Sequence, residues 1–169
     1  MTVLMKRRQL AFVAVACCGA VLAADRTPAA PPAAGDSVQT FRALRGVRGH
    51  FDGGPWNDDV DRWQGRKHVA MQRLAEQALR EHTPAAQLRR SVGEPDAILQ
   101  PGTAAHARAL ETAQWLAVAD SAPQAANNAL SANQVAVLWL YRWRGSHDQL
   151  VLTLERGRVV MAGWLYERE

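Results

Sequence analysis

The sequence predicts an α+β fold in which two helices pack on one face of a three-stranded antiparallel meander, with an alanine-rich insertion at about 101–134. Three observations lead to this expectation. Apolar and polar residues alternate through the C-terminal segment, around two tight turns. Segment 66–81 repeats apolar residues at intervals of three and four, and a shorter helical segment ends at Gly93. Because a single sheet needs cover to be stable, we expect the helices to lie on its apolar face.

The first 24 residues have the composition of a secretory signal peptide. Cations at 6–8 precede an apolar run at 10–22, and cleavage is expected after Ala23 or Ala24. The run is short for a membrane span, which needs about 20 apolar residues. The alternatives are an uncleaved anchor and a lipoprotein, because the residues up to Cys17 loosely resemble a lipobox. We expect a periplasmic or secreted protein that meets a membrane only through an N-terminal anchor or lipid, if it keeps one.

Removal of this segment changes the charge and the cysteine content. The chain has 20 Lys and Arg against 16 acids, but three cations fall in the signal segment, so residues 25–169 carry 17 against 16. This small excess is no argument for a nucleic-acid partner. Both cysteines, Cys17 and Cys18, also lie in the signal segment. The mature chain would then have no disulfide, no thiolate metal site and no cysteine nucleophile.

The rest of the chain predicts a linker followed by one domain. Residues 25–37 are rich in proline and alanine without an apolar period, which predicts a disordered tether. Residues 38–169 have the length of a single domain. Within it, the glycines of 41–56 favour a loop or short irregular elements. The alanine-rich insertion contains a candidate helix at 104–118.

Two helices are predicted between 60 and 93. The first is best defined at 66–81, and Asp58 or Asp59 would cap its start. Its apolar face follows from 3-4 spacing and consists of Val60, Trp63, Lys67, Met71, Leu74 and Ala78. The second opens at Thr83-Pro84 and ends at Gly93, and Pro95 prevents its continuation.

The three strands are predicted at 135–144, 149–155 and 158–166. A two-residue turn at Arg156-Gly157 pairs Leu152 with Met161, and a four-residue loop at 145–148 pairs Trp143 with Leu150. Both turns place one set of large side chains on the helix-facing side: Val137, Trp139, Tyr141, Trp143, Leu150, Leu152, Leu154, Val159 and Met161.

The opposite face of the meander is also partly apolar. Either segment 103–133 folds over it, or it is a docking surface for a protein partner. Trp56, in a glycine- and proline-rich segment at 51–58, is the second candidate contact; it belongs to an exposed recognition loop or plugs the surface over a helix. The candidate contact residues are Trp56, Leu138, Leu140, Arg142, Val151, Val160, Trp164 and Tyr166.

No set of residues predicts a catalytic site, a metal site or a cofactor. Asp52 and the acids at 58–61 could bind a divalent cation, but Gly54 and Trp56 stand where an EF-hand would place its next ligands. Segment 146–148 (Ser-His-Asp) contains the residue types of a catalytic triad. Consecutive residues of a turn project in different directions, however, and a triad must converge. We therefore expect a protein without enzymatic activity.

Short motifs in the region 66–169 resemble the SmpA/OmlA, or BamE-like, periplasmic domain family. They are the helix 83–95 with its Gly-x-Pro end, the Trp139-Leu140-Tyr141 strand, and the strand–turn–strand 150–159 with its glycine before a valine. The resemblance implies two helices against a three-stranded sheet, as in one half of the β-lactamase inhibitor protein. It also implies a non-catalytic envelope protein that acts through protein–protein contacts, in that family often in outer-membrane assembly. The alternative is an inhibitor or immunity-type protein that blocks an enzyme.

Overall fold

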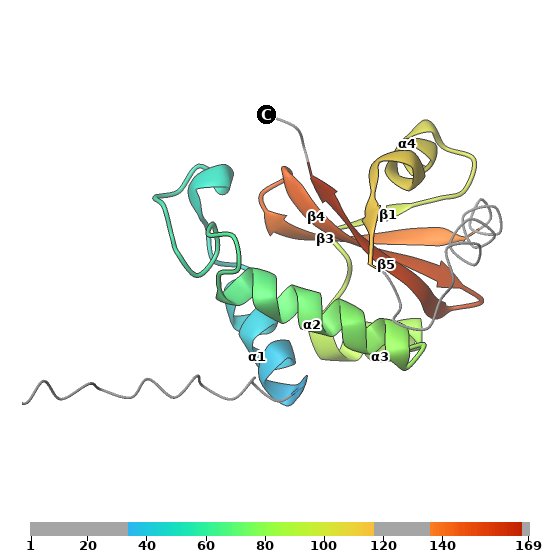
Figure 1. Ribbon diagram of the computed structural model, residues 1–169, viewed down its shortest axis with the longest axis horizontal. Helices are drawn as coiled ribbons and strands as arrows, with labels where there is room; N and C mark the ends of the chain where they lie inside the picture. Colours follow the sequence, from blue (N-terminus) through green and yellow to red (C-terminus); the bar gives the residue numbers. More distant parts are fainter. Residues whose placement is uncertain (1–33, 117–135, 167–169) are drawn as a thin grey trace, which may run out of the picture. The chain divides into compact units, whose positions relative to one another are not determined.

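The computed structural model describes residues 34–116 and 136–166 (Figure 1). This part of the chain has an α+β fold with four α-helices, one short 3-10 helix and a five-stranded antiparallel sheet. The predicted α+β class is therefore confirmed, whereas the three-stranded sheet is wrong. The predicted signal segment 1–24 lies outside the described residues. Within them, no helix is long and apolar enough to span a membrane.

The sheet consists of the predicted meander and two short edge strands. β3 (Val137–Arg144), β4 (Asp148–Glu155) and β5 (Arg158–Tyr166) form its centre. β1 (Ala97–Leu99) pairs with β3, and β2 (Gln114–Trp115) pairs with β5, so the strand order is β1-β3-β4-β5-β2. The edge strands come from the connection between the second predicted helix, which ends at Gly93, and the meander. Strands of two or three residues are too short to show the alternation by which a strand is recognised.

The register of the meander differs from the prediction at two points. Arg156-Gly157 forms the expected turn, but Thr153 then pairs with Met161, which leaves Val160 as an extra residue in β5. In the other hairpin, Leu150 pairs with Tyr141 rather than with Trp143.

These two differences have unequal consequences. In the hairpin of β3 and β4 the pairing is shifted by two residues, so each side chain of these strands keeps its predicted face. The bulge in β5 instead exchanges the faces beyond it. Trp164 joins the core on the helix-facing side, with Tyr166 packed against it, and the prediction that both lie on the opposite face is wrong. Met161 correspondingly leaves the helix-facing set.

Three helices cover one face of the sheet (Figure 1). They are α1 (Ala34–Leu44), α2 (Arg66–Arg80) and α3 (Ala85–Val92). The last two confirm the predicted helices, although α2 begins after Gly65, so neither Asp58 nor Asp59 caps it. The core that they form with the sheet contains Phe41, Met71, Leu79, Leu88, Val92, Trp139, Tyr141, Trp143, Leu152, Val159 and Trp164.

α1 is the main element that the sequence did not predict. It begins within the expected tether 25–37 and extends into the segment 41–56, for which irregular structure was expected. Phe41 is only 1% exposed and lies edge-on against Tyr141, with ring centroids 6.1 Å apart. The apolar side chains of α1 are few and follow an alanine–proline stretch, so the helical period of the sequence is weak there.

α4 (Ala104–Thr112) covers the opposite face of the sheet. Ala109 and Leu110 pack against Leu138, Leu140 and Val151 in a second core. Thr103 caps the start of the helix, since its hydroxyl accepts from the backbone N–H of His106. The His106 ring forms a hydrogen bond with the backbone oxygen of Ala136 at 2.8 Å. Of the two alternatives for this face, the structure shows the folded cover. The helix ends at Thr112, earlier than the predicted 118, because the chain becomes extended to form β2.

Candidate functional site: the tryptophan loop

Within 34–116 and 136–166, the most exposed large apolar side chains lie on the segment between α1 and α2. We call residues 49–65, which include the 3-10 helix η1 (His50–Asp52), the tryptophan loop. Trp56 is 57% exposed and Trp63 is 54% exposed. Among the described residues, the remaining large hydrophobic side chain of this kind is Ile98 on edge strand β1, at 41%. Two exposed indoles on one loop are unusual, because tryptophan is highly buried on average.

The backbone of the tryptophan loop closes around a buried carboxylate. Asp61 is fully buried, and its Oδ2 accepts hydrogen bonds from the backbone N–H groups of His50 (2.9 Å) and Asn57 (2.8 Å). Gly49 is needed for this approach, since a Cβ there would lie 2.1 Å from Asp61 Oδ1. Hydrogen bonds to a charged acceptor contribute about 1.5–3 kcal/mol each. The buried carboxylate therefore fixes the loop conformation.

Two side chains of β3 attach the tryptophan loop to the sheet. The indole N–H of Trp143, a fully buried core residue, donates to the backbone oxygen of Val60 at 2.8 Å. Arg144 donates to the backbone oxygen of Asp61 at 3.3 Å and also pairs with Asp148, Nε to Oδ2 at 2.6 Å. The loop is thus anchored to the end of a central strand.

Trp56 is held outward by its own loop. Its indole N–H donates to Oδ1 of Asp58 at 2.7 Å, and its ring centroid lies 6.4 Å from that of His50. Because more than half of its surface is exposed, Trp56 does not plug the surface over a helix. Of the two alternatives, the structure shows the exposed position, and a role in recognition stays a prediction.

Trp63 lies on a stack of buried aromatic rings. One contact is with His68 of α2, with centroids 4.5 Å apart. His68 in turn contacts Trp143 at 4.3 Å and Trp164 at 4.9 Å, and among the described residues neither of its ring nitrogens has a hydrogen-bond partner. Burial, and secondarily the positive charge of Arg144, lowers the pKa of His68 to about 4. At neutral pH the imidazole is uncharged, so it serves as an apolar support beneath Trp63.

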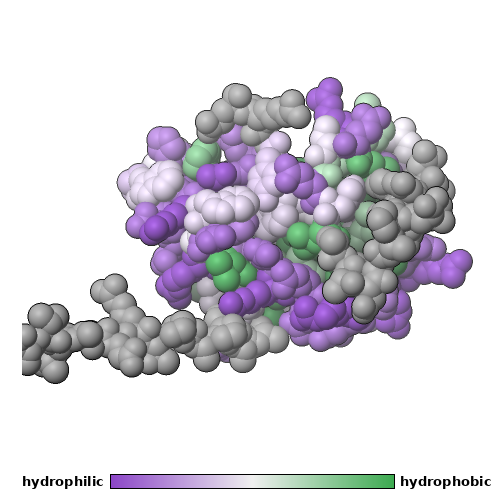
Figure 2. All heavy atoms as spheres, viewed as in Figure 1, coloured by the Kyte–Doolittle hydropathy of each residue, from purple (hydrophilic) through white to green (hydrophobic). Residues whose placement is uncertain are grey.

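The predicted contact residues do not form one surface. Trp56 and Arg142 are exposed, and Val160 and Tyr166 are half-buried. Those that the structure buries are Leu138, Leu140 and Val151 beneath α4, and Trp164 in the helix-facing core. On the face drawn in Figure 2, the described surface is mainly hydrophilic and the hydrophobic residues gather in small patches.

Two residues of the site were assigned other places by the sequence pattern. Trp63 fits the apolar spacing of the following helix, but that helix begins only after Gly65, so Trp63 lies in the loop. A Cβ at Gly65 would lie 2.4 Å from the backbone oxygen of Asp58, and this close approach marks the helix boundary. Asp61 could be read as a metal ligand or a cap, but it binds the loop backbone. Gly65 was the available signal for Trp63, and Gly49, which lies against the carboxylate, was the available signal for Asp61.

Three of the acids considered as metal ligands, Asp58, Asp59 and Asp61, have protein partners. Asp58 accepts from Trp56, and Asp59 pairs with Arg66 at 3.1 Å. In the part of the chain that the structure describes, no three His, Cys, Asp or Glu side chains are grouped to hold a metal ion. The Ser-His-Asp turn is also engaged, since Asp148 pairs with Arg144 and the His147 ring lies 5.4 Å from that of Phe51.

Comparisons of the chain with family models, with curated proteins and with solved structures gave no match.

Proposed function

We propose that this chain is a non-catalytic, exported envelope protein that acts through protein–protein contacts, with the tryptophan loop as its contact surface. The observation that supports this proposal most directly is the pair of exposed indoles, Trp56 and Trp63, on a loop whose backbone is fixed by buried Asp61. The export signal rests on residues 1–24 of the sequence and the envelope setting on the BamE-like motifs.

The physical chemistry of binding favours such a loop as a contact surface. Tryptophan is enriched among the residues that dominate protein–protein affinity, where truncation to alanine costs about 2 kcal/mol or more. A loop that is ordered before binding also avoids part of the conformational entropy that association otherwise costs. The carboxylate anchor and the attachment to β3 supply that order.

Two roles are compatible with such a surface. The first is an accessory or scaffold role in outer-membrane assembly, as the resemblance implies. The second is an inhibitor or immunity-type role, in which the loop blocks an enzyme. The second is favoured by the fixed loop, because inhibitor complexes of this kind form with little change in the interface backbone.

A capture experiment from envelope extract tests the proposal. The full chain, Trp56→Ala, the double variant with Trp63→Ala and the control Ile98→Ala are compared, each first checked for folding by thermal unfolding. We expect the partner to be captured by the unaltered chain and by Ile98→Ala, and at least tenfold less by the tryptophan variants. Equal recovery by the folded Trp56→Ala and double variants would overturn the tryptophan loop as the contact surface.

The identity of the captured protein separates the two roles. Several assembly-machinery subunits support the scaffold role, whereas one stoichiometric enzyme whose activity falls on binding supports the inhibitor role. Export is checked by intact mass of the protein recovered from the envelope. A mature terminus just after Ala23 or Ala24 supports secretion, a lipidated Cys17 supports a lipoprotein, and an intact N-terminus in the cytoplasm would refute export.

A further inference from the structure

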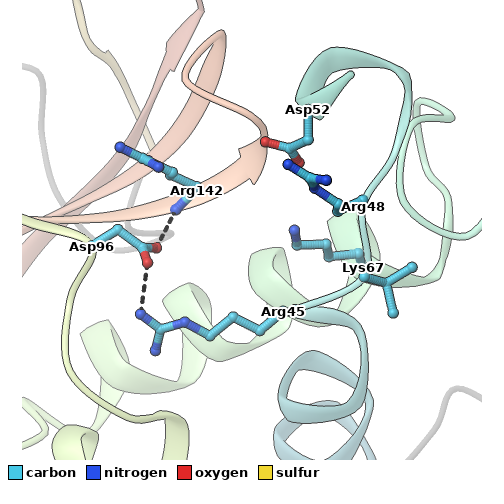
Figure 3. Close-up of a pocket in the computed structure, with 8 residues that line it drawn as sticks. Arg45, Arg48, Asp52, Lys67, Asp96 and Arg142 are labelled. Atoms are coloured by element: carbon cyan, nitrogen blue, oxygen red, sulfur yellow. Dashed lines mark hydrogen bonds and ion pairs between the residues drawn. The ribbon is translucent and has the colours of Figure 1, made fainter. Parts of the chain in front are cut away.

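A charged cavity of about 230 Å³, lined by neither exposed tryptophan, is built from several parts of the chain (Figure 3). Its lining comes from the turn after α1, from η1, from the first turn of α2, from the residue before β1 and from β3. The charged side chains that line it are Arg45, Arg48, Asp52, Lys67, Asp96 and Arg142.

One ion pair of the cavity belongs to the framework of the fold. Arg45 donates to the backbone oxygens of Val92, at 2.8 Å, and of Glu94. Its guanidinium also pairs with Oδ1 of Asp96 at 2.8 Å, and Oδ2 of the same carboxylate accepts from the backbone of Arg142 at 2.8 Å. Arg45 and Asp96 therefore offset each other's charge and join α1, α3 and β3.

The other charged side chains leave an excess of positive charge. Besides that pair, the cavity is lined by three cations, Arg48, Lys67 and Arg142, and by one further acid, Asp52, so the excess is two charges. Arg48 and Arg142 are exposed, so they can turn toward a ligand without loss of a buried contact.

Lys67 is the residue that indicates a ligand. It is 2% exposed, and its side chain extends into the cavity (Figure 3). Among the residues that the structure describes, none accepts a hydrogen bond from its ammonium group or pairs with it. Buried charges in proteins are normally paired, because an isolated buried ion is costly. Burial lowers the pKa of Lys67, and the negative charges of Asp52, Asp96 and Asp61 act in the opposite direction. An anion at the ammonium group would remove this cost.

We propose that the cavity binds a small, doubly charged oxyanion of the phosphate type, with Lys67 as its central donor and with Arg48 and Arg142 at its sides. Two negative charges match the excess of two positive charges. Three cationic donors also suit the several acceptor oxygens of such an ion. A free phosphate ion and the terminal group of a phosphate monoester share this chemistry. The site does not depend on the tryptophan loop binding a partner.

Calorimetric titration of the full chain tests the proposal. Inorganic phosphate, methyl phosphate and acetate are added at pH 7.5 and constant ionic strength. We expect one phosphate ion to bind per chain in a saturable way. Its affinity should be at least tenfold higher than that of acetate, because phosphate carries two negative charges to match the excess of two positive charges and acetate carries one. Methyl phosphate binding as well as inorganic phosphate assigns the site to monoesters too, and its exclusion assigns the site to the free ion. Heat that depends only on ionic strength, or equal affinity for acetate, would overturn the proposal.

Three variants locate the binding. Lys67→Met removes the buried charge but keeps most of the length of the unbranched side chain, and we expect it to weaken phosphate binding at least tenfold. Arg142→Gln should also weaken it while leaving the fold intact, because only its backbone holds Asp96. Arg90→Gln, an exposed arginine of α3 outside the cavity, should bind as the unaltered chain does. Unchanged affinity in Arg142→Gln and in folded Lys67→Met would place any bound anion elsewhere, which would refute the site.

Discussion

The buried imidazole of His68 predicts a specific loss of stability in acid. Its pKa falls from an ordinary 6.5 to about 4 because the ring is buried and Arg144 lies nearby. Between these two values the unfolded chain holds a proton on His68 that the folded chain does not. The free energy of unfolding therefore rises with pH through this range. The contribution is fully present above pH 6.5 and is lost as the pH falls toward 4.

The size of the effect follows from the two pKa values. One pKa unit corresponds to about 1.4 kcal/mol, so the difference between 6.5 and about 4 allows a loss of at most about 3.4 kcal/mol. Between pH 7 and pH 5 the imidazole of His68 becomes mostly protonated in the unfolded chain, and the free energy of unfolding should fall by about 2 kcal/mol. This is a large fraction of the stability of a typical domain.

His68→Phe separates this effect from the titration of the carboxylates. Phenylalanine preserves the ring contacts with Trp63, Trp143 and Trp164, and no hydrogen bond to a residue that the structure describes is lost, because the imidazole nitrogens have no partner there. Urea unfolding of both proteins at pH 7, 6 and 5, followed by tryptophan fluorescence, gives the difference. We expect His68→Phe to lose about 2 kcal/mol less than the unaltered chain over this range. Parallel pH profiles, or an imidazole that titrates near 6.5 by NMR, would refute the buried stack.

Three further predictions concern the loop, the bulge and the edge strand. Asp61→Ala should lower the free energy of unfolding, measured in urea, by about 3 kcal/mol, because two backbone donors lose their acceptor. Amide hydrogen exchange at His50 and Asn57 should become faster, and unchanged exchange would contradict the role of Asp61 as an anchor. Trp164→Ala should cost about 3–5 kcal/mol in urea unfolding, whereas a loss below 1 kcal/mol would place Trp164 outside the core and remove the bulge. Gly163→Ala should displace β2, since its Cβ would lie 2.8 Å from the backbone oxygen of Gln114, and so expose the Leu116 amide to exchange. Gly46→Ala is the matched control, because nothing lies within 4 Å of its Cβ, and a Gly163→Ala protein with the same Leu116 protection would refute the pairing of β2.

The sequence predicted the elements whose apolar period is long and bounded by turn residues. α2 and α3 have such boundaries in Gly65, Thr83-Pro84 and Gly93, and the meander has one in Arg156-Gly157. In that turn both φ angles are positive, 49° and 74°, as the short connection requires. Local chemistry determines these features, so the sequence alone was sufficient for them.

The features that were not predicted depend on contacts between distant segments. The extra residue Val160 in β5 has no local signature, yet it decides which face carries Trp164. The edge strands β1 and β2 exist only because β3 and β5 offer them backbone partners. Likewise, Asp61 is an ordinary loop acid in the sequence. It becomes a structural anchor only once His50 and Asn57 lie around its carboxylate.

The start of α2 is the place where the sequence departs from the rule that a buried helix face is apolar. Lys67 falls on that face by spacing, and it is buried there, as is its neighbour His68. Neither side chain has a hydrogen-bond partner among the described residues, although burial of a polar group without a partner is costly. Such local departures concentrate at functional sites, where a cost in stability is retained for another purpose. His68 supports Trp63 and Lys67 extends into the charged cavity, so the same turn of helix underlies both proposed binding sites.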